Sequence, residues 1–298
     1  MTMLQVFINL VPVTLVQSMV YAFVALAIMI PFRTLSLPDL TVEGSFPLGG
    51  CMAAALLTAG LDPWTSSAIA IAAGFGAGAA TALIHLYFRI PSLLAGIQIA
   101  TMIWSVNLRT MGMPNKAVLP ELSILDWISP TILFSTWLQV ALFSGIVLIV
   151  LIALIGFYRT EMGLSLRCIG ANPRLSPALA INSRFYVLLG FGIANALGAF
   201  GGAIVVQQQG YADITMGFGI LVNGLAALIM GEAIIGRSTI SRQLIAPVVG
   251  SVIYYQLVSL GLATGLHPSD LKFLTGAFVL VTLALPLLTG RSKSFLGA

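Results

Sequence analysis

Few side chains in this sequence could carry out covalent chemistry or bind a metal, and they are scattered. His85 and His267 lie far apart, and Cys51 and Cys168 fall in opposite halves of the chain. The strings that mark a Walker A loop, a serine nucleophile elbow, an H-E-x-x-H zinc site and a C-x-x-C pair do not occur. We therefore expect no catalytic residue, no metal site and no cofactor bound by this chain.

Carboxylate and amide side chains within apolar stretches are the remaining candidates. Asp39 and Glu43 lie four residues apart in a segment interrupted by prolines. Amides inside apolar stretches either hydrogen-bond neighbouring helices or line a path for a polar solute. The residues that we expect to line such a path are Asp39, Glu43, Gln98, Asn195 and Asn223, and further amides of this kind are Asn107 and Gln256.

The composition indicates which elements must position these residues. Of 298 residues, 59% are hydrophobic and 7% are charged, whereas about a quarter of a typical soluble domain is charged. A soluble protein of this length could not bury so much apolar surface. We expect an all-α, polytopic transmembrane bundle in the lipid bilayer, with one permease domain over 1–298. The net charge of +4 then reflects topology and not nucleic-acid binding.

Proline, glycine and charged residues divide the chain into apolar stretches, each of which we expect to be a span. At roughly 20 residues a span, the apolar total suffices for about nine helices, within a range of eight to ten. The stretches are 5–31, 44–60, 65–88, 92–111, 131–158, 184–206, 217–236, 243–263 and 271–290.

In a nine-span chain, the arginine-rich connections all fall on one side of the membrane. They contain Arg89, Arg159, Arg167, Arg174, Arg184, Arg237, Arg242, Arg291 and Lys293. The connections on the other side carry mostly acidic residues. The positive-inside rule places the arginine-rich side in the cytoplasm, with the C-terminus inside and the N-terminus outside.

The segment 33–50 predicts a broken helix. Two prolines forbid an uninterrupted helix and three glycines loosen what remains; they are Pro38, Pro47, Gly44, Gly49 and Gly50. Within a membrane, the freed backbone groups of a break are tolerated only beside a cavity or inside protein. The alternative is an ordinary cytoplasmic turn in which the two acids are solvated.

The connection 159–184 is long and carries four arginines. Asn172 can cap a helix, and Pro173 suits the first helical position, so we expect a short helix over 173–181. Two glycines, Gly163 and Gly170, are expected to break the backbone ahead of it.

The apolar side chains of this short helix suggest a docking function. Leu175 and Ala178 would give it a small apolar surface suited to a cleft on a cytoplasmic partner. The alternative is a solvated basic loop that is retained for topology.

The string GLSLRCIGANPRLSPALAIN resembles the coupling segment of ABC importer permeases, of the family that serves branched-chain amino acids, ribose-type sugars and nucleosides. The matching residues are Gly163, Arg167, Gly170, Asn172 and Pro173, whereas Cys168 stands where alanine is usual and Ala180 where glycine is usual. The strings DLTVEGSFPLGG at 39–50 and LIMGEAIIGRST before the eighth stretch are also similar to the family. The resemblance therefore covers nearly the whole chain.

This resemblance implies a transmembrane subunit with no catalysis of its own, in the cytoplasmic (inner) membrane of a prokaryote. Its partners would be a second permease copy, an ATP-binding subunit that hydrolyses ATP with Mg²⁺, and an extracytoplasmic solute-binding protein. The helix over 173–181 would enter a groove on the ATP-binding subunit and transmit its closure to the spans, which would switch between inward and outward openings. The residues implied in coupling are Gly163, Arg167, Gly170, Asn172, Pro173, Arg174, Leu175 and Ala178.

The strings VEG and MGMPN, the latter at 111–115, look closest to a subgroup of the family that takes up aromatic amino acids or related small molecules. The main alternative is an ion-coupled secondary transporter that acts without an ATPase. It would need ionisable groups near the membrane midplane. A membrane enzyme or an exporter permease is less compatible with the scattered acids and the short cytoplasmic connections.

Overall fold

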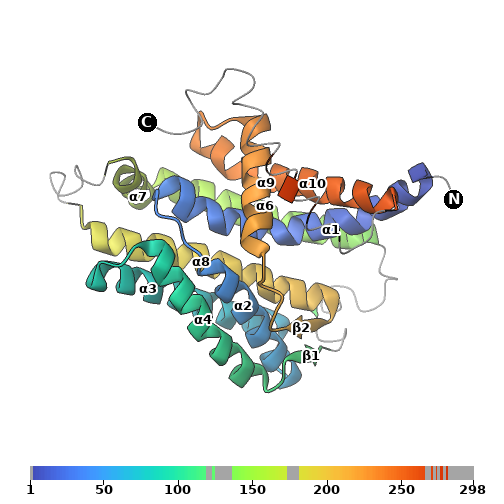
Figure 1. Ribbon diagram of the computed structural model, residues 1–298, viewed down its shortest axis with the longest axis horizontal. Helices are drawn as coiled ribbons and strands as arrows, with labels where there is room; N and C mark the ends of the chain where they lie inside the picture. The colour runs from blue at the N-terminus through green and yellow to red at the C-terminus, as the bar shows by residue number, and fades with distance from the viewer. Residues whose placement is uncertain are drawn as a thin grey trace.

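The computed structural model describes residues 3–118, 123–124, 136–172 and 181–265, together with residues 270, 273, 276–277 and 280. The helices are α1 (Met3–Met29), the π-helical turn η1 (Ile30–Thr34), α2 (Val42–Thr58), α3 (Pro63–Phe88), α4 (Ser92–Met111), α6 (Thr136–Arg159), α7 (Glu161–Ala171), α8 (Ser183–Gln209), α9 (Ile220–Ile235) and α10 (Ile240–Ala263) (Figure 1). The strands are β1 (Asn115–Ala117) and β2 (Tyr211–Asp213).

The predicted all-α, multi-pass architecture is confirmed. Among the described residues, α1 with η1, α3, α6, α8 and α10 are long and apolar enough to cross a membrane, and α2 and α9 are shorter apolar helices. Eight of the nine predicted stretches coincide with a helix. The ninth, 271–290, lies almost entirely outside the described residues.

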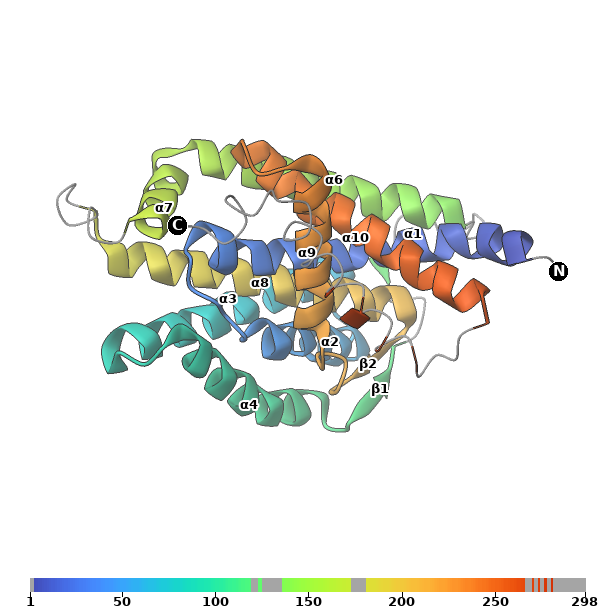
Figure 2. The same cartoon turned by 45° about the horizontal axis from the view of Figure 1, so that its top comes forward.

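Two of the longest helices, α1 and α8, form the centre of the bundle. In Figure 2 they run through its middle, with α2, α3 and α4 on one side and α6 on the other, while α9 crosses at a steep angle. Helix α10 packs along α1 and α9. Small residues allow the backbones to approach closely. A Cβ at Gly74 or Gly78 of α3 would meet the α8 backbone at Asn195 or Phe191. The glycines of α3 therefore fix the packing of α3 on α8.

The predicted break after the first span exists, but it is shorter than expected. It covers residues 35–41 and includes Pro38, whereas Pro47 lies within α2 together with the three glycines at 44, 49 and 50. The expectation that these residues interrupt the helix is wrong, because a proline costs only one hydrogen bond and the membrane interior favours helix for the rest. The glycines serve contact instead: a Cβ at Gly49 would meet the carbonyl of Ala199 in α8.

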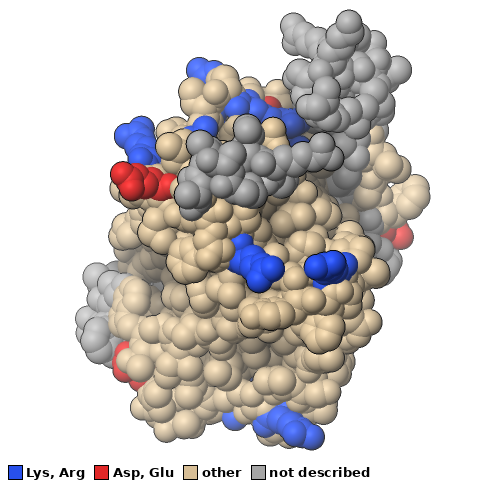
Figure 3. Space-filling view, turned by 90° about the vertical axis from the view of Figure 1, so that its left-hand side faces the viewer, with Lys and Arg blue, Asp and Glu red and all other residues tan. Residues whose placement is uncertain are grey.

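A small antiparallel sheet was not predicted. Strand β1 pairs with β2 so that Lys116 lies opposite Ala212, and it joins the chain after α4 to the chain after α8. Strands of three residues are too short for a recognisable period. The other end of the bundle, where α3 ends and α8 begins, faces the viewer in Figure 3, and Lys and Arg side chains are spread over it.

Candidate functional site

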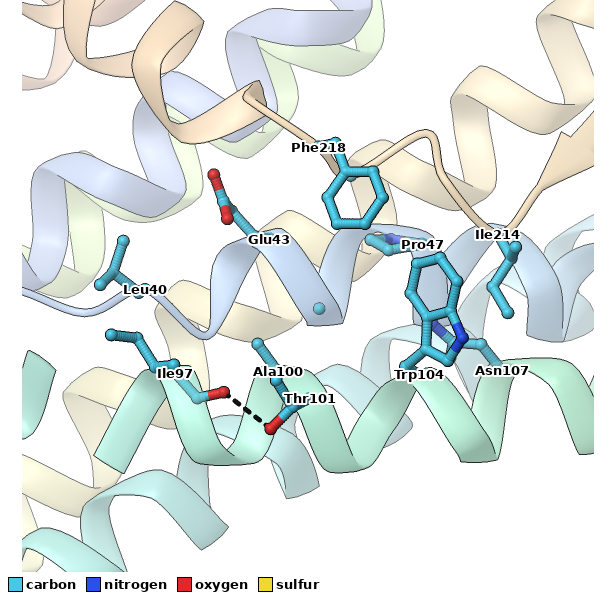
Figure 4. Close-up of a pocket in the computed structure, with 12 residues that line it drawn as sticks. Leu40, Glu43, Pro47, Ile97, Ala100, Thr101, Trp104, Asn107, Ile214 and Phe218 are labelled. Carbon is cyan, nitrogen blue, oxygen red and sulfur yellow. Dashed lines mark hydrogen bonds between the residues drawn. The ribbon is translucent and has the colours of Figure 1, made fainter. Parts of the chain in front are cut away.

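A cavity of about 630 Å³ lies beside the break, between the first half of α2, the helix α4 and the segment that joins β2 to α9. Its walls are formed by Leu40, Glu43, Gly44, Pro47, Ile97, Ala100, Thr101, Trp104, Asn107, Ile214, Gly217 and Phe218 (Figure 4). Because α2 begins only after the break, its first turns are available as one wall of this cavity.

Two polar side chains in the cavity have unused binding capacity. Glu43 is partly buried, accepts a hydrogen bond from the backbone N–H of Gly219 and forms no ion pair with any described residue. Asn107 is 1% exposed, and neither its amide nitrogen nor its amide oxygen has a hydrogen-bond partner. A buried amide without partners is unfavourable, so a polar ligand in the cavity would stabilise it.

An aromatic pair forms the apolar part of the cavity. The rings of Trp104 and Phe218 stack with their centroids 5.3 Å apart and an angle of 26° between their planes. Phe218 also lines a second cavity of about 210 Å³, which includes Asn223 and Gln17. The Phe218 ring is thus part of the wall between two cavities.

Asp39 and Asn195, both predicted to line a path, belong instead to a buried hydrogen-bond network at the break. The Asn195 amide donates to Asp39 Oδ2 over 2.7 Å and accepts from the hydroxyl of Ser45 over 2.8 Å. Asp39 Oδ1 accepts from the backbone N–H and the hydroxyl of Thr41. The Thr41 hydroxyl is also 2.7 Å from that of Thr81. This network joins the start of α2 to α3 and α8. Asp39 and Asn195, which belong to it, are completely buried.

The other two predicted path residues lie outside the main cavity. Gln98 is on an exposed face of α4 and does not line the cavity. Asn223 is partly buried in α9, accepts a hydrogen bond from the Tyr254 hydroxyl over 2.8 Å and lines the smaller cavity. Of the five predicted path residues, Glu43 alone lines the main cavity.

Three cavity residues were missed as path residues. Asn107 was recognised as an amide within a span, and its lack of partners is visible only in the structure. Trp104 and Phe218 had no signal, because they meet from segments 114 positions apart in the sequence.

An ion-pair cluster lies near the other end of the break. Glu232 of α9 accepts two hydrogen bonds from Arg33 of η1, at 2.9 and 2.7 Å, and lies 3.1 Å from the Arg237 guanidinium. Glu232 is 3% exposed. Burial lowers the pKa of Arg237, which the neighbouring carboxylate of Glu232 partly offsets. The cluster therefore joins the end of the first span to the α9–α10 connection.

The predicted coupling region is described only in part. Gly163, Arg167 and Gly170 lie in α7, and Asn172 follows its last residue. The structure does not test the short helix expected at 173–181, because residues 173–180 lie outside the described part of the chain. These residues include Pro173, Arg174, Leu175 and Ala178.

The expectation that Gly163 and Gly170 break the backbone is wrong, since both are helical. They serve close contact instead. A Cβ at Gly170 would overlap the carbonyl oxygen of Thr34 in η1, and one at Gly163 would overlap the backbone of Phe157. The hydroxyl of Ser36 also donates to the carbonyl oxygen of Gly170 over 3.2 Å. Helix α7 therefore packs directly on the broken helix that leads to the cavity.

Comparison with known proteins agrees with this architecture. The chain is 32% identical over 269 residues to the tyrosine transport system permease protein of Clostridioides difficile (strain R20291), covering 90% of this chain and 88% of that protein. It is 34% identical over 286 residues to an uncharacterized protein of Rickettsia prowazekii (strain Madrid E), covering 93% and 97%. No solved structure is significantly similar.

The family described as branched-chain amino acid transport system / permease component matches residues 12–285. This match spans nearly all of the described helices, including the break, the cavity and α7. The chain is therefore a multi-pass membrane protein that belongs to the family of permease components of branched-chain amino acid transport systems.

Proposed function

We propose that this chain is the membrane-spanning subunit of an ATP-driven importer in the cytoplasmic membrane of a prokaryote. It would receive a small organic solute, an amino acid or a related molecule, from an extracytoplasmic binding protein. A second permease copy and ATP-binding subunits would complete the transporter. The family match and the tyrosine transport permease among its relatives support this proposal.

The observation that carries the proposal is the cavity beside the break. It combines two side chains: the carboxylate of Glu43, which forms no ion pair with any described residue, and the amide of Asn107, which forms no hydrogen bond with any described residue. The stacked rings of Trp104 and Phe218 provide an apolar surface in the same cavity. A solute with an ammonium group and an apolar or aromatic body would be complementary to these three features.

Contacts between helices supply a route for coupling. A partner that moves α7 would push, through Gly170, on Thr34 and the break. Glu43 lies in the first turn of α2, just after the break, so this movement would change the wall of the cavity. The spans would thereby alternate between an inward and an outward opening, biased by ATP in the partner subunit.

The alternative of an ion-coupled carrier receives less support. Asp39 is fully buried and already hydrogen-bonded to Thr41 and Asn195, and Glu232 is paired with two arginines. Glu43 is the acid in the described part of the spans that remains without such partners.

Uptake into proteoliposomes tests the proposal. The chain, its ATP-binding subunit and the binding protein would be reconstituted, and uptake of labelled tyrosine and other amino acids measured with and without ATP. We expect uptake to require ATP. Glu43→Gln should reduce it about tenfold or more, since it removes one charge-assisted hydrogen bond. ATP-independent uptake driven by an ion gradient would instead support the secondary carrier.

Asp62→Asn is the matched control, because it also replaces a carboxylate by an amide of the same shape. Asp62 caps α3, and hydrogen bonds from the Thr65 hydroxyl and N–H lower its pKa, so a negative charge is lost here too. Asparagine caps helices as well as aspartate does. An equal loss of uptake in both variants would contradict a specific role for Glu43.

A further inference from the structure

A second, basic pocket lies at the arginine-rich end of the bundle, away from the transport cavity. It has a volume of about 340 Å³ and is formed where α3 ends and α8 begins. It is lined by Leu83, Leu86, Tyr87, Arg89, Asn182, Arg184, Phe185 and Leu188. The two helix ends lie side by side in both Figure 1 and Figure 2. The transport function proposed above makes no use of this pocket.

The two arginines of the pocket have no partner of opposite charge among the residues that the structure describes. Arg89 and Arg184 are exposed, form no hydrogen bond or ion pair with a described residue, and share the pocket with no acidic side chain. Two guanidinium groups that line one pocket repel each other, and an anion between them would offset this repulsion. The pocket is therefore complementary to a phosphate group, which can accept paired hydrogen bonds from arginine.

Both arginines occupy positions in the local structure that are energetically unfavourable for them. Arg89 adopts a left-handed conformation, with φ of 56° and ψ of 30°, directly after α3. This region is unfavourable for residues other than glycine. Arg184 lies in the first turn of α8, where the helix dipole disfavours a positive charge. Neither position is explained by the stability of its own helix.

Most of the other pocket residues are apolar, and three of them, Leu83, Tyr87 and Phe185, are exposed, as expected at a membrane surface. Tyr87 is 76% exposed and Phe185 is 48% exposed, and aromatic side chains are typical of the membrane–water interface. Leu83, Leu86 and Leu188 continue the pocket along α3 and α8, away from the helix ends. A soluble anion would leave these leucines uncovered, whereas an acyl chain would cover them.

We propose that this pocket binds the phosphate of an anionic phospholipid. The phosphate would lie between Arg89 and Arg184, and an acyl chain would follow the three leucines. Asn182 and Arg184 stand at the end of the connection 159–184, so the bound lipid would also anchor this connection to the membrane surface. The pocket lies at a helix end, and the proposal holds whichever side of the membrane that end faces.

Lipid binding to the purified transporter tests the proposal. Full-length chain in mild detergent, with the partners that co-purify, would be titrated with phosphatidylglycerol and with phosphatidylcholine of the same acyl chains. Binding would be followed by native mass spectrometry and by the melting temperature. We expect phosphatidylglycerol alone to bind at low lipid concentration. Arg89→Gln with Arg184→Gln should weaken this binding about 30-fold.

The matched control is Arg109→Gln with Lys116→Gln, which removes two positive charges from the opposite end of the bundle. We expect the control to bind phosphatidylglycerol like the unaltered chain. An equal loss in the control, or no loss in the pocket variant, would overturn the proposal.

Titration with free anions distinguishes the two possible sources of the phosphate, a phospholipid and a soluble anion. Inorganic phosphate and glycerol phosphate should not raise the melting temperature at concentrations where phosphatidylglycerol does. An equal rise with the free anions would make this a site for a soluble phosphate and overturn the lipid assignment. If the double variant does not purify, the single variants Arg89→Gln and Arg184→Gln should each show a smaller loss. A failure of amino-acid uptake would leave this result unchanged, since lipid binding is measured without transport.

Discussion

Asn107 is a residue at which stability and the proposed binding of a solute are expected to oppose each other. Its amide is buried on α4 with both polar atoms unpartnered, in the wall of the main cavity. An unpartnered buried amide costs about 1–3 kcal/mol. A residue that is unfavourable for the empty protein is expected where a ligand supplies the missing hydrogen bonds.

Asn107→Leu should therefore raise the melting temperature in detergent or leave it unchanged, because leucine has the same branched arrangement of heavy atoms, no unpaired polar atom, and an adjacent cavity for its larger methyl groups. ATP-dependent amino-acid uptake should fall about tenfold, since two hydrogen bonds to the solute are lost. Uptake assays in proteoliposomes and thermal unfolding of the same preparation check both parts. A lower melting temperature with normal uptake would mean that the amide has a structural role.

Gln98→Leu is the matched comparison, since it also exchanges an amide for leucine on α4. Gln98 faces outward and does not line the cavity, so we expect uptake to stay near that of the unaltered chain. A loss equal to that of Asn107→Leu would instead place the path on the outer face of α4. It would then support the prediction from the sequence that Gln98 lines the path.

The sequence could predict that a single residue lines the cavity only where its neighbours in the sequence indicated a break in the helix. Glu43 follows a proline-containing break, and the structure does place it in a cavity. Asp39 lies four positions earlier and is fully buried in a hydrogen-bond network, because α3 and α8 cover it. Which side of the broken segment meets other helices depends on tertiary packing, which a local pattern does not contain.

At the scale of elements, the contact between α7 and η1 joins the predicted coupling region directly to the broken helix. Gly170 leaves no space for a side chain against the carbonyl of Thr34. The hydroxyl of Tyr158, at the end of α6, donates to the Thr34 hydroxyl over 3.1 Å and supports the same junction. The two elements are in close contact. A small displacement of α7 must therefore either move the broken segment with it or open a gap between α7 and η1.

Gly170→Ala should lower the melting temperature, because the added methyl group overlaps a backbone oxygen, and overpacking of this kind costs about 1–3 kcal/mol. Solute-stimulated ATP hydrolysis by the reconstituted complex should fall as well, while basal hydrolysis persists. Both are measured on the same purified complex.

Gly156→Ala in α6 is the control for this change, since a Cβ there meets no atom within 4 Å. In an open helical position, alanine is favoured over glycine by about 1 kcal/mol. Its melting temperature should stay the same or rise. If both variants behave alike, the α7–η1 contact has no special role.

Most helices could be predicted because long apolar stretches are reliable signals for spans. The errors concern proline and glycine. Pro47 was expected to interrupt a helix, and Gly163 and Gly170 to break the backbone ahead of one, yet all three are helical. In each case the residue permits a close contact or loses only one hydrogen bond. The sequence shows that a residue is small or that it has no backbone N–H to donate. The residues that pack against it lie in another part of the chain, so the local pattern does not reveal the contact.

At the scale of the whole molecule, the main cavity lies apart from α7 and the basic pocket along the length of the bundle. The cavity opens beside α2 and α4, whereas α7 and the basic pocket lie at the arginine-rich end (Figure 2). The order of helices along the sequence could be predicted, but their neighbours could not. The packing of α3 on α8, for example, joins residues near 74–78 to residues near 191–199.

Replacing both Leu175 and Ala178 by aspartate tests the attachment of the partner subunit. The family resemblance implies that both residues would enter a groove on the ATP-binding subunit, and charges in such an apolar groove would be costly. The double variant should insert in the membrane normally, lose ATP-dependent uptake and retain less ATP-binding subunit in a pull-down.

Met113→Asp provides the comparison, because Met113 is 48% exposed and lies at the opposite end of the bundle, just before β1. It should keep both uptake and the ATP-binding subunit. Unchanged uptake in the Leu175 and Ala178 double variant would remove the short helix from the coupling scheme.

The cluster of Arg33, Glu232 and Arg237 also restricts how this sequence can evolve. Glu232 is buried between two guanidinium groups, so its loss in a single step would leave two positive charges facing each other at the edge of the membrane. Loss of Arg33 alone would remove the bidentate partner of a buried carboxylate. Substitutions at these positions are therefore tolerated together and not one by one, and in a collection of related permeases the three positions should vary as a unit.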